Sequence, residues 1–560
     1  MKKILSVILS ALMLLSLCSV AASAEGDELV VTVVNDIHYN SFDTAKKSNS
    51  VSEDFAHVNS AGRLYYEIDA VFMAFLEAAA ANESDCVLIP GDITETGTDV
   101  QVEEMTALLA EFEASTGKKV FVVPGNHDVL NNSKAEFMEA YAAFGYDEAL
   151  EVDTKSASYV VDLNDEYRLI AIDSTTEGTG AHSVFAERLQ WIAEQGEKAE
   201  ADGKKLIGMH HQNLLGHMIL STVIQPKGVV VAESPEAAEV YAAAGIKYIF
   251  TAHTHDHDIA AYTAADGTVI YDVVTGSLGG IGTPYRVVTF GDEVKFETRH
   301  IDKVDISYFP EGISENALAL AESNFTEYQE VVTDLSYAIT FNNYTKAKTL
   351  KSLLKLEDEE MNAIIDKVGD RLNYALNMPF ERENETVEGH SIEAIVEKYS
   401  TTVPDTDYEN MIDLAVTIYQ AHNFGGENLP AYSDEVILAT RGLAAVISYA
   451  LSEVCAEEYA KVLSFLTGLL GVEVPVNFLI YAGDGVKRFE GIEIFITTAI
   501  LPVMADFTTD REPADSNVIL PGYTELVEEN EQTFWEKLID FFKMIYAAVR
   551  TLLAFLPEWK

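Results

Sequence analysis

Between residues 29 and 300, short β-branched runs alternate with helical stretches, and this alternation limits the fold more than any other feature of the chain. The runs Leu29–Val34, Cys86–Ile89 and Lys119–Val123 predict buried strands, because parallel strands covered on both faces are almost continuously apolar. Intervening stretches such as Leu64–Ala81 carry apolar residues at helical spacing. The pattern predicts an α/β domain in which helices cover layered sheets.

A polar cluster follows each of five predicted strands. The clusters contain Asp36 and His38, then Asp92, then Asn126, His127 and Asp128, then His210 and His211, and finally His253 and His255. Taken singly, each cluster is weak evidence and is better explained by a turn or a solvated loop. Because the carboxyl ends of strands in layered α/β sheets meet at one crevice, the five clusters together predict a single functional site.

This ordered set resembles the calcineurin-like metallophosphoesterase family, whose pattern runs Asp-x-His, Gly-Asp, Gly-Asn-His-Asp/Glu, His and Gly-His-x-His. The match covers about residues 29–300. The resemblance implies a four-layer α/β/β/α sandwich and a metal-dependent phosphoric ester hydrolase. Ala252 departs from the pattern, because the family usually has glycine there, and Glu95 stands three residues after Asp92. Purple acid phosphatases have tyrosine at that place, and protein Ser/Thr phosphatases have a nearby arginine, so the bacterial phosphodiesterase-like branch is expected.

Two divalent ions in one site need oxygen and imidazole ligands, with one carboxylate shared between them. Asp92 is the candidate for the shared carboxylate. By the resemblance, Asp36, His38 and His255 complete the first site, while Asn126, His210 and His253 complete the second. The only cysteine near these motifs is Cys86, on the strand before Asp92, which excludes a thiolate zinc site. Mn, Fe or Zn suits the mixed ligands.

A hydroxide bridging the two ions would attack phosphorus in line. His127 is placed to donate a proton to the leaving oxygen or to stabilise its charge. Asp128 either orients the His127 imidazole or caps the helix that follows. His211 and Asn213 are expected to line the pocket. Four other histidines lie in polar loops and are expected at the surface, namely His57, His182, His217 and His257.

After about residue 301, long helical patterns replace the strands. We expect a signal peptide over residues 1–24, a catalytic domain over residues 25–304, an α-helical region of unknown role over residues 305–515, and an acidic linker with an amphipathic helix over residues 516–560. The apolar stripe of that last helix runs from Phe534 to Leu556. The helix packs on the helical region or lies in a membrane interface, and both alternatives stay open.

Two apolar runs in the second half raise the question of a membrane span. They cover residues 462–482 and 492–507, and acidic residues and prolines interrupt both. A membrane helix needs about 20 consecutive apolar residues, so we expect buried helices of a bundle instead.

The N-terminus has the pattern of an export signal, with two lysines, an apolar run and a small-residue cleavage site at Ala22–Ala24. A lipid anchor at Cys18 is disfavoured, because a leucine precedes this cysteine where a small residue is expected. The protein is therefore expected to be secreted or extracytoplasmic. Cys86 and Cys455 allow a single bridge but no disulfide framework.

The charge balance limits the partners of the protein. The chain carries 91 Asp and Glu against 37 Lys and Arg, a formal net charge of −54. Nucleic-acid polymers are excluded, because their binding needs clustered Lys and Arg. We expect hydrolysis of a phosphodiester or phosphomonoester bond in a small molecule. A nucleotidase-like or phospholipid-headgroup hydrolase, or a non-catalytic surface-binding protein on the same fold, are the alternatives.

Overall fold

The computed structural model describes residues 28–40, 54–176, 186–217, 230–231, 234–344, 359–381, 391–398, 402–425, 433–453 and 513–523, with a few isolated positions besides. Several predicted features lie outside the described residues, namely the signal peptide, His182, Cys455, the apolar run at 462–482, most of the run at 492–507 and the final amphipathic helix. These features stay predictions.

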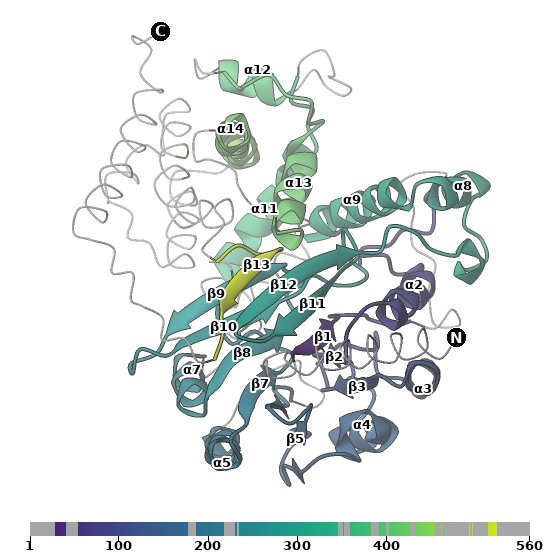
Figure 1. Cartoon of the computed structure of the whole chain (residues 1–560). Helices are drawn as coiled ribbons and strands as arrows, with labels where there is room; N and C mark the ends of the chain where they lie inside the picture. The colour runs from purple at the N-terminus through teal and green to yellow at the C-terminus, as the bar shows by residue number, and fades with distance from the viewer. Residues whose placement is uncertain are drawn as a thin grey trace, which may run out of the picture.

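Two β-sheets pack face to face at the centre of the described structure (Figure 1). The first sheet contains, in spatial order, β13 (Val518–Pro521), β12 (Glu293–His300), β11 (Pro284–Phe290), β1 (Leu29–Val33), β2 (Cys86–Ile89) and β3 (Lys119–Val122). The second contains β4 (Glu151–Val152), β5 (Tyr159–Asp162), β6 (Tyr167–Ala171), β7 (Lys205–Met209), β8 (Ile246–Thr251), β10 (Val269–Val274) and β9 (Asp258–Thr263). Strands β1, β2 and β3 run parallel, as do β6, β7, β8 and β10.

The alternation of side chains along the central strands explains why these sheets stack. Successive residues of a strand point to opposite faces of its sheet. Val31 on β1 and Leu88 on β2 lie in the core between the sheets, whereas Val87 and Ile89 face the outer helices. Because both faces are covered, the central strands β1, β2 and β3 are mostly apolar, as predicted.

Helices cover the outer face of each sheet, which confirms the predicted four-layer α/β/β/α sandwich. Helices α2 (Ile68–Ala81) and α3 (Asp99–Thr116) pack on the first sheet, and α5 (Ala186–Asp202) and α7 (Ser234–Ala243) pack on the second (Figure 1). Two short helical segments follow β3, namely α4 (Lys134–Ala140) and the π-helical turn η1 (Ala142–Tyr146).

The chain after β12 is mostly helical, as predicted. A 3₁₀ turn η2 (Ile306–Tyr308) leads into α8 (Glu315–Ser323) and α9 (Phe325–Tyr344), which share the apolar core of α2. A second core is formed by α11 (Glu359–Leu376), α12 (Ile392–Glu397), α13 (Met411–Asn423), α14 (Asp434–Ala450) and the 3₁₀ turn η4 (Leu451–Glu453). Among the described residues, no helix has the length and apolar character to cross a membrane.

Strand β13 corrects the predicted linker at residues 516–560. It pairs antiparallel with β12, so that Leu520 lies opposite Val294 and is buried between the sheets. At the end of the strand, the ammonium group of Lys247 donates a hydrogen bond to the Gly522 carbonyl at 2.7 Å, and the Tyr248 hydroxyl donates to the Pro521 carbonyl at 2.6 Å. A four-residue edge strand that buries one large apolar side chain leaves too short a pattern to predict from sequence.

Candidate metal centre

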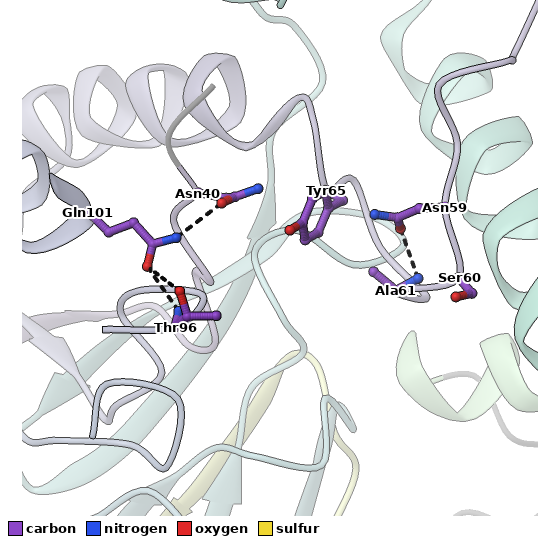
Figure 2. Close-up of a pocket in the computed structure, with 7 residues that line it drawn as sticks. All are labelled: Asn40, Asn59, Ser60, Ala61, Tyr65, Thr96 and Gln101. Atoms are coloured by element: carbon purple, nitrogen blue, oxygen red, sulfur yellow. Dashed lines mark hydrogen bonds between the residues drawn. The ribbon is translucent and has the colours of Figure 1, made fainter. Parts of the chain in front are cut away.

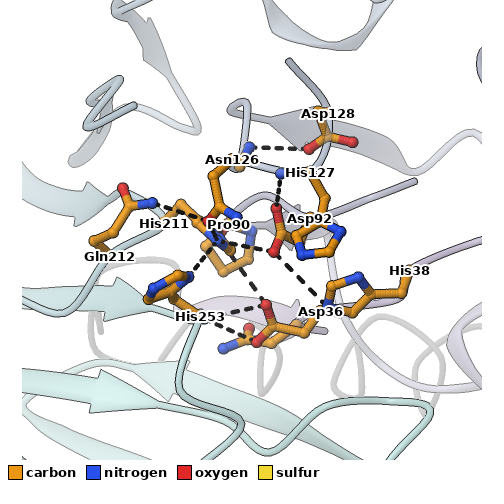
Figure 3. A network of polar contacts seen from close by, with 12 residues as sticks. Asp36, His38, Pro90, Asp92, Asn126, His127, Asp128, His211, Gln212 and His253 are labelled. Carbon is orange, nitrogen blue, oxygen red and sulfur yellow. Dashed lines mark hydrogen bonds and ion pairs between the residues drawn. The ribbon is translucent and has the colours of Figure 1, made fainter. Parts of the chain in front are cut away.

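The polar clusters that follow β1, β2, β3, β7 and β8 meet at one edge of the two sheets (Figure 3). Asp92 lies at the centre of the site. Its Oδ2 is 3.1 Å from Nε2 of His211 and 3.7 Å from Nε2 of His38. The His38 Nε2 is 3.1 Å from Nε2 of His255, and one Asp36 oxygen is 4.0 Å from the same His255 atom.

His211 connects Asp92 to the other side of the site. Its Nε2 is 3.1 Å from the Asn126 amide oxygen and 3.2 Å from Nδ1 of His253. The structure therefore brings together every predicted metal ligand except His210.

His210 does not reach the site, and this corrects the predicted ligand set. The side chain is fully buried, and its ring lies 5.9 Å from the ring of Tyr241 on α7. Burial lowers the pKa of His210 to about 4, so the imidazole is neutral at physiological pH. Neighbouring residues at a strand end point in different directions, and here the second histidine of the pair faces the cluster.

Five site residues have left-handed backbone conformations that side chains with a Cβ rarely adopt. The φ angles are 45° at Asp36, 50° at His38, 46° at Asp92, 75° at His253 and 62° at His255. Each such conformation costs about 1–3 kcal/mol unless the surrounding structure compensates. Backbone strain of this kind concentrates at functional sites, which agrees with the role predicted for these residues.

Contacts of Nδ1 determine which ring nitrogen two of the histidines turn toward the cluster. Nδ1 of His211 donates to the Pro90 carbonyl at 2.9 Å. Nδ1 of His38 lies 3.2 Å from a carboxylate oxygen of Glu95. With Nδ1 protonated, Nε2 of the neutral ring carries the lone pair that can bind a metal.

Glu95 and Arg63 were not predicted as part of the site. The Glu95 carboxylate forms an ion pair with the Arg63 guanidinium as well as its contact with His38. Burial opposes ionisation, but the Arg63 charge prevails and lowers the pKa of Glu95 to about 2. Glu95 is therefore a permanent carboxylate that orients His38. The sequence signal was the departure from the family pattern at this position.

His127 is held beside the cluster by two hydrogen bonds. Its backbone N–H donates to Oδ1 of Asp92 at 2.8 Å, and its Nδ1 donates to the Glu95 carbonyl at 2.6 Å. The ring stands edge-on to the ring of His38 with 4.5 Å between centroids. Because Nδ1 is engaged, Nε2 is the ring nitrogen of His127 that remains available to other groups, and it belongs to a set of donor atoms with Asp92 and His38.

Asp128 has neither of the two roles predicted for it. Its carboxylate accepts hydrogen bonds from the backbone N–H groups of Thr94 and Gly125 and from the Thr94 hydroxyl, at 2.8 to 2.9 Å. The ring nitrogen of His127 bonds to a carbonyl instead, and the following helix is capped by Ser133. Asp128 is a positioning residue that joins the loops after β2 and β3.

The electrostatics of the cluster fit bound cations. Burial would raise the pKa of Asp92, but the imidazoles of His211 and His127 hold it well below its usual range. Burial raises the pKa of Asp36 to about 7. Burial acts to lower the pKa of His211, but the Asp92 carboxylate raises it to about 9. The carboxylates thus attract positive charge, which a proton on His211 or a divalent cation can supply.

Two sets of side chains have donor atoms close enough to hold a metal ion. One set is Asp36, His38 and His255, and the other is Asp92, His211 and His253. In each set, the atoms lie within 4.8 Å of one another. A third set joins Asp92 and His38 to His127. Carboxylate oxygens and imidazole nitrogens in these numbers suit Mn, Fe or Zn, so the residues fit the predicted pair of ions.

Three histidines expected at the surface are largely enclosed instead. His217 is 5% exposed and lies between two aspartates, and His257 is 1% exposed and hydrogen-bonded to Thr298. His57 contacts Glu67 at 2.9 Å. Asn213 does not line the site but donates a hydrogen bond to Thr251 at 3.0 Å. Single polar residues in loops gave no sign of these partners, which come from distant parts of the chain.

The amino-acid sequence of this chain is similar to the sequences of known phosphoesterases. Residues 29–257 match the sequence profile of the calcineurin-like phosphoesterases. A probable glycerophosphodiester phosphodiesterase of Arcobacter nitrofigilis is 31% identical over 160 residues, which cover 28% of this chain and 54% of that protein. A cAMP/cGMP dual specificity phosphodiesterase of Mycobacterium tuberculosis is 22% identical over 227 residues, covering 39% of this chain and 66% of that protein. The chain thus spans between about half and two thirds of these relatives.

Solved structures with a detectable likeness include a dimetal phosphatase from Danio rerio, with 11% identity and a TM-score of 0.36. The likeness covers 50% of this chain and 98% of that one. The 5'-nucleotidase precursor from Thermus thermophilus has 13% identity and a TM-score of 0.30, with 55% of this chain and 59% of that one covered.

Proposed function

We propose that this chain, whose residues 29–257 match the profile of the calcineurin-like phosphoesterases, is a member of that family and a hydrolase that cleaves phosphoester bonds with two divalent metal ions. The observation that supports this most strongly is the position of Asp92 between two sets of ligands. A carboxylate shared in this way is what a two-metal site requires. Asp36, His38 and His255 would hold one ion, and Asn126, His211 and His253 would complete the second site.

The metals, when bound, supply a nucleophile at neutral pH and neutralise the phosphoryl oxygens. The protein groups orient the metal ligands and donate the proton. Glu95 and the Pro90 carbonyl keep Nε2 of His38 and His211 turned toward the site. His127 donates a proton from Nε2 to the leaving oxygen, since its Nδ1 is held by the Glu95 carbonyl.

The substrate is a small phosphoester outside the cytoplasm. The net charge of −54 disfavours polyanionic substrates. The predicted signal peptide over residues 1–24 supports export. Both curated relatives carry phosphodiesterase names, which supports a diester as the first substrate to test.

The decisive experiment is metal-dependent turnover of a chromogenic diester and a chromogenic monoester. The purified protein is stripped of metal, then reconstituted with Mn, Fe(II) or Zn, and rates on bis-p-nitrophenyl phosphate and p-nitrophenyl phosphate are measured. Asp92→Asn is expected to lose both metal and turnover, by at least about 100-fold, because even outer groups of metal sites contribute 10–100-fold. The matched control is Asp266→Asn, which changes an aspartate in an exposed turn.

Two results would contradict the proposal. The first is an unreactive wild-type protein with every metal. The second is an Asp92→Asn variant that keeps both metals and near-normal turnover.

A further inference from the structure

A cavity of about 420 Å³ lies next to the metal centre, between the loop before α2 and the start of α3 (Figure 2). Besides one alanine, the residues that line it are uncharged and polar, namely Asn40, Asn59, Ser60, Tyr65, Thr96 and Gln101. Its volume is in the range of pockets that bind small molecules. Amide and hydroxyl groups therefore determine what this cavity can bind.

The chain itself places the cavity beside the candidate metal ligands. Asn40 comes two residues after His38, so their Cα atoms are at most about 7 Å apart. Thr96 directly follows Glu95, whose side chain contacts His38 and whose carbonyl holds His127. A substrate whose phosphorus lies at the metals would extend a substituent into this cavity.

Gln101, near the start of α3, fixes the orientation of the lining residues Asn40 and Thr96. Its Nε2 donates to the Asn40 amide oxygen at 3.1 Å, and its Oε1 accepts from the backbone N–H and the hydroxyl of Thr96, both at 3.0 Å. Figure 2 shows the Asn40 side chain and the Tyr65 hydroxyl facing one another across the cavity. These hydrogen bonds preorganise the polar groups of the cavity, which lowers the entropic cost of binding a ligand.

Helix α9 of the helical region holds the opposite wall. The Ser336 hydroxyl accepts from the Gly62 N–H at 2.8 Å and donates to the Asn59 carbonyl at 2.6 Å. The Thr340 hydroxyl donates to the Ser60 carbonyl at 3.0 Å. These bonds fix the backbone that carries Asn59 and Ser60.

Arg63 and Glu95, which lie close in sequence to the lining residues Tyr65 and Thr96, form an ion pair with one another. A charged substituent would lose its hydration without gaining an opposite charge from the lining residues. A purely apolar substituent would leave amide and hydroxyl groups without hydrogen bonds. An uncharged group with several hydroxyls avoids both costs.

We infer that this cavity binds an uncharged, hydroxyl-bearing substituent of the phosphoester, such as a polyol or a sugar; the inference rests on the proposed function. The test uses two p-nitrophenyl diesters with the same leaving group, one with a glyceryl and one with a propyl substituent. Wild-type protein is expected to hydrolyse the glyceryl ester with a kcat/KM about tenfold higher than that for the propyl ester, since one hydrogen bond is worth up to about tenfold.

Tyr65→Phe removes one hydroxyl from the cavity and is expected to reduce the glyceryl-to-propyl ratio several-fold. Gln101→Leu should reduce it further, and Tyr65→Phe alone decides the test if Gln101→Leu does not fold. The control is Thr106→Ala, which removes a hydroxyl that bonds only to carbonyls of α3 itself.

Equal rates of wild-type protein on both esters would overturn the inference while leaving the proposed hydrolase intact. A ratio that Tyr65→Phe does not change would overturn it too. A thymidine p-nitrophenyl ester that is preferred over the glyceryl ester would show that the cavity binds a nucleobase instead. Hydrolysis of neither diester nor monoester would contradict the proposed function itself.

Discussion

His210 and His211 are neighbours in sequence, yet only the second reaches Asp92. His211→Ala is therefore expected to lose metal and at least about 100-fold in turnover, as for other groups that bind or orient a metal. His210→Leu should keep both ions and turn over close to the wild-type rate, because a neutral buried imidazole is replaced by an apolar side chain. Metal content and bis-p-nitrophenyl phosphate turnover of both variants check this.

The comparison requires that both variants fold, which circular dichroism and thermal unfolding establish. A folded His210→Leu protein without metal would restore the ligand set predicted from the sequence.

The hydrogen bond from His127 to the Glu95 carbonyl leads to a prediction about proton transfer. A general acid contributes most when the leaving group is poor, because a stable anion leaves without a proton. His127→Ala should keep its metals and lose roughly 10²–10⁴-fold in rate on an alkyl ester. The loss on a p-nitrophenyl ester should be much smaller.

Rates on both esters and metal content are measured for wild type and variant. Equal losses on the two esters would leave His127 as a stabiliser of charge. Loss of metal would make it a ligand, which the third set of donor atoms allows.

The sequence pointed to the candidate metal ligands, but it did not point to the residues that orient those ligands. Asp36, Asp92 and His253 directly follow strands, so the fold alone brings them to one edge. Arg63 lies before α2 and Glu95 lies after β2, so they meet through two separate loops that no periodic pattern describes. Orienting groups of this kind require the three-dimensional structure.

At the scale of elements, the loop after β7 is held in place by Asp272 of β10. One Asp272 oxygen accepts from the backbone N–H groups of Leu214 and Leu215 at 2.8 and 2.7 Å. The same oxygen is 3.2 Å from Nε2 of His217, whose Nδ1 is 2.7 Å from Asp258. This buried network fixes the segment that carries His211.

The network predicts a pH-dependent stability. Burial acts to lower the pKa of His217, but the charge of Asp272 and the bond to Asp258 raise it to about 10, against 6.5 for an ordinary histidine. A raised pKa stabilises the folded state fully below pH 6.5, and the stabilisation is lost as the pH rises toward 10. His217→Gln should therefore lower the free energy of unfolding most at pH 6, by about 3–5 kcal/mol as for a broken buried ion pair.

Thermal unfolding of both proteins at pH 6, 8 and 9.5 checks this prediction. The difference in melting temperature between wild type and variant should shrink as the pH rises. A constant difference across this range would mean that His217 is not charged in the folded protein.

Elements with a strong period were predicted from the sequence, and elements without one were not. The strands around β1 and β7 and the helices that cover them have clear apolar patterns. Strand β12 buries only two apolar residues, Val294 and Phe296, and its second half is polar, while β13 is only four residues long, so neither stands out among loops. Their pairing depends on contacts between residues far apart in the sequence.

At the scale of the whole molecule, the helical region and the catalytic domain are joined by buried polar contacts. The Tyr328 hydroxyl of α9 donates to Glu67 at 2.7 Å. Just after α13, the ring of the partly exposed Phe424 also stacks on His300 of β12, with 5.3 Å between ring centroids. Within the helical region, Asn423 donates to the Tyr337 hydroxyl at 2.8 Å and so joins α13 to α9. These contacts explain how α9 can hold the wall of the cavity beside the metal centre.

The segment at residues 513–523 forms hydrogen bonds with parts of the catalytic domain that are far away in the sequence. The Asp515 carbonyl accepts from the buried guanidinium of Arg286, and the Tyr523 hydroxyl donates to the Leu206 carbonyl at 2.5 Å. The segment thus contacts β11 in the first sheet and β7 in the second.

Two truncations distinguish the contribution of the segment at residues 513–523 from that of the amphipathic helix predicted after it. Truncation after Gln532 keeps β13, so turnover and melting temperature should stay near wild type. Truncation after Glu512 removes Leu520 from the core and the hydrogen bonds to Lys247 and Tyr248, and should cost about 3 kcal/mol or more of folding free energy. Thermal unfolding and diester turnover of both proteins are measured.

If the shorter protein is as stable as the longer one, β13 contributes nothing to the stability of the sheet. If the longer protein folds but has no turnover, the final helix is needed for catalysis.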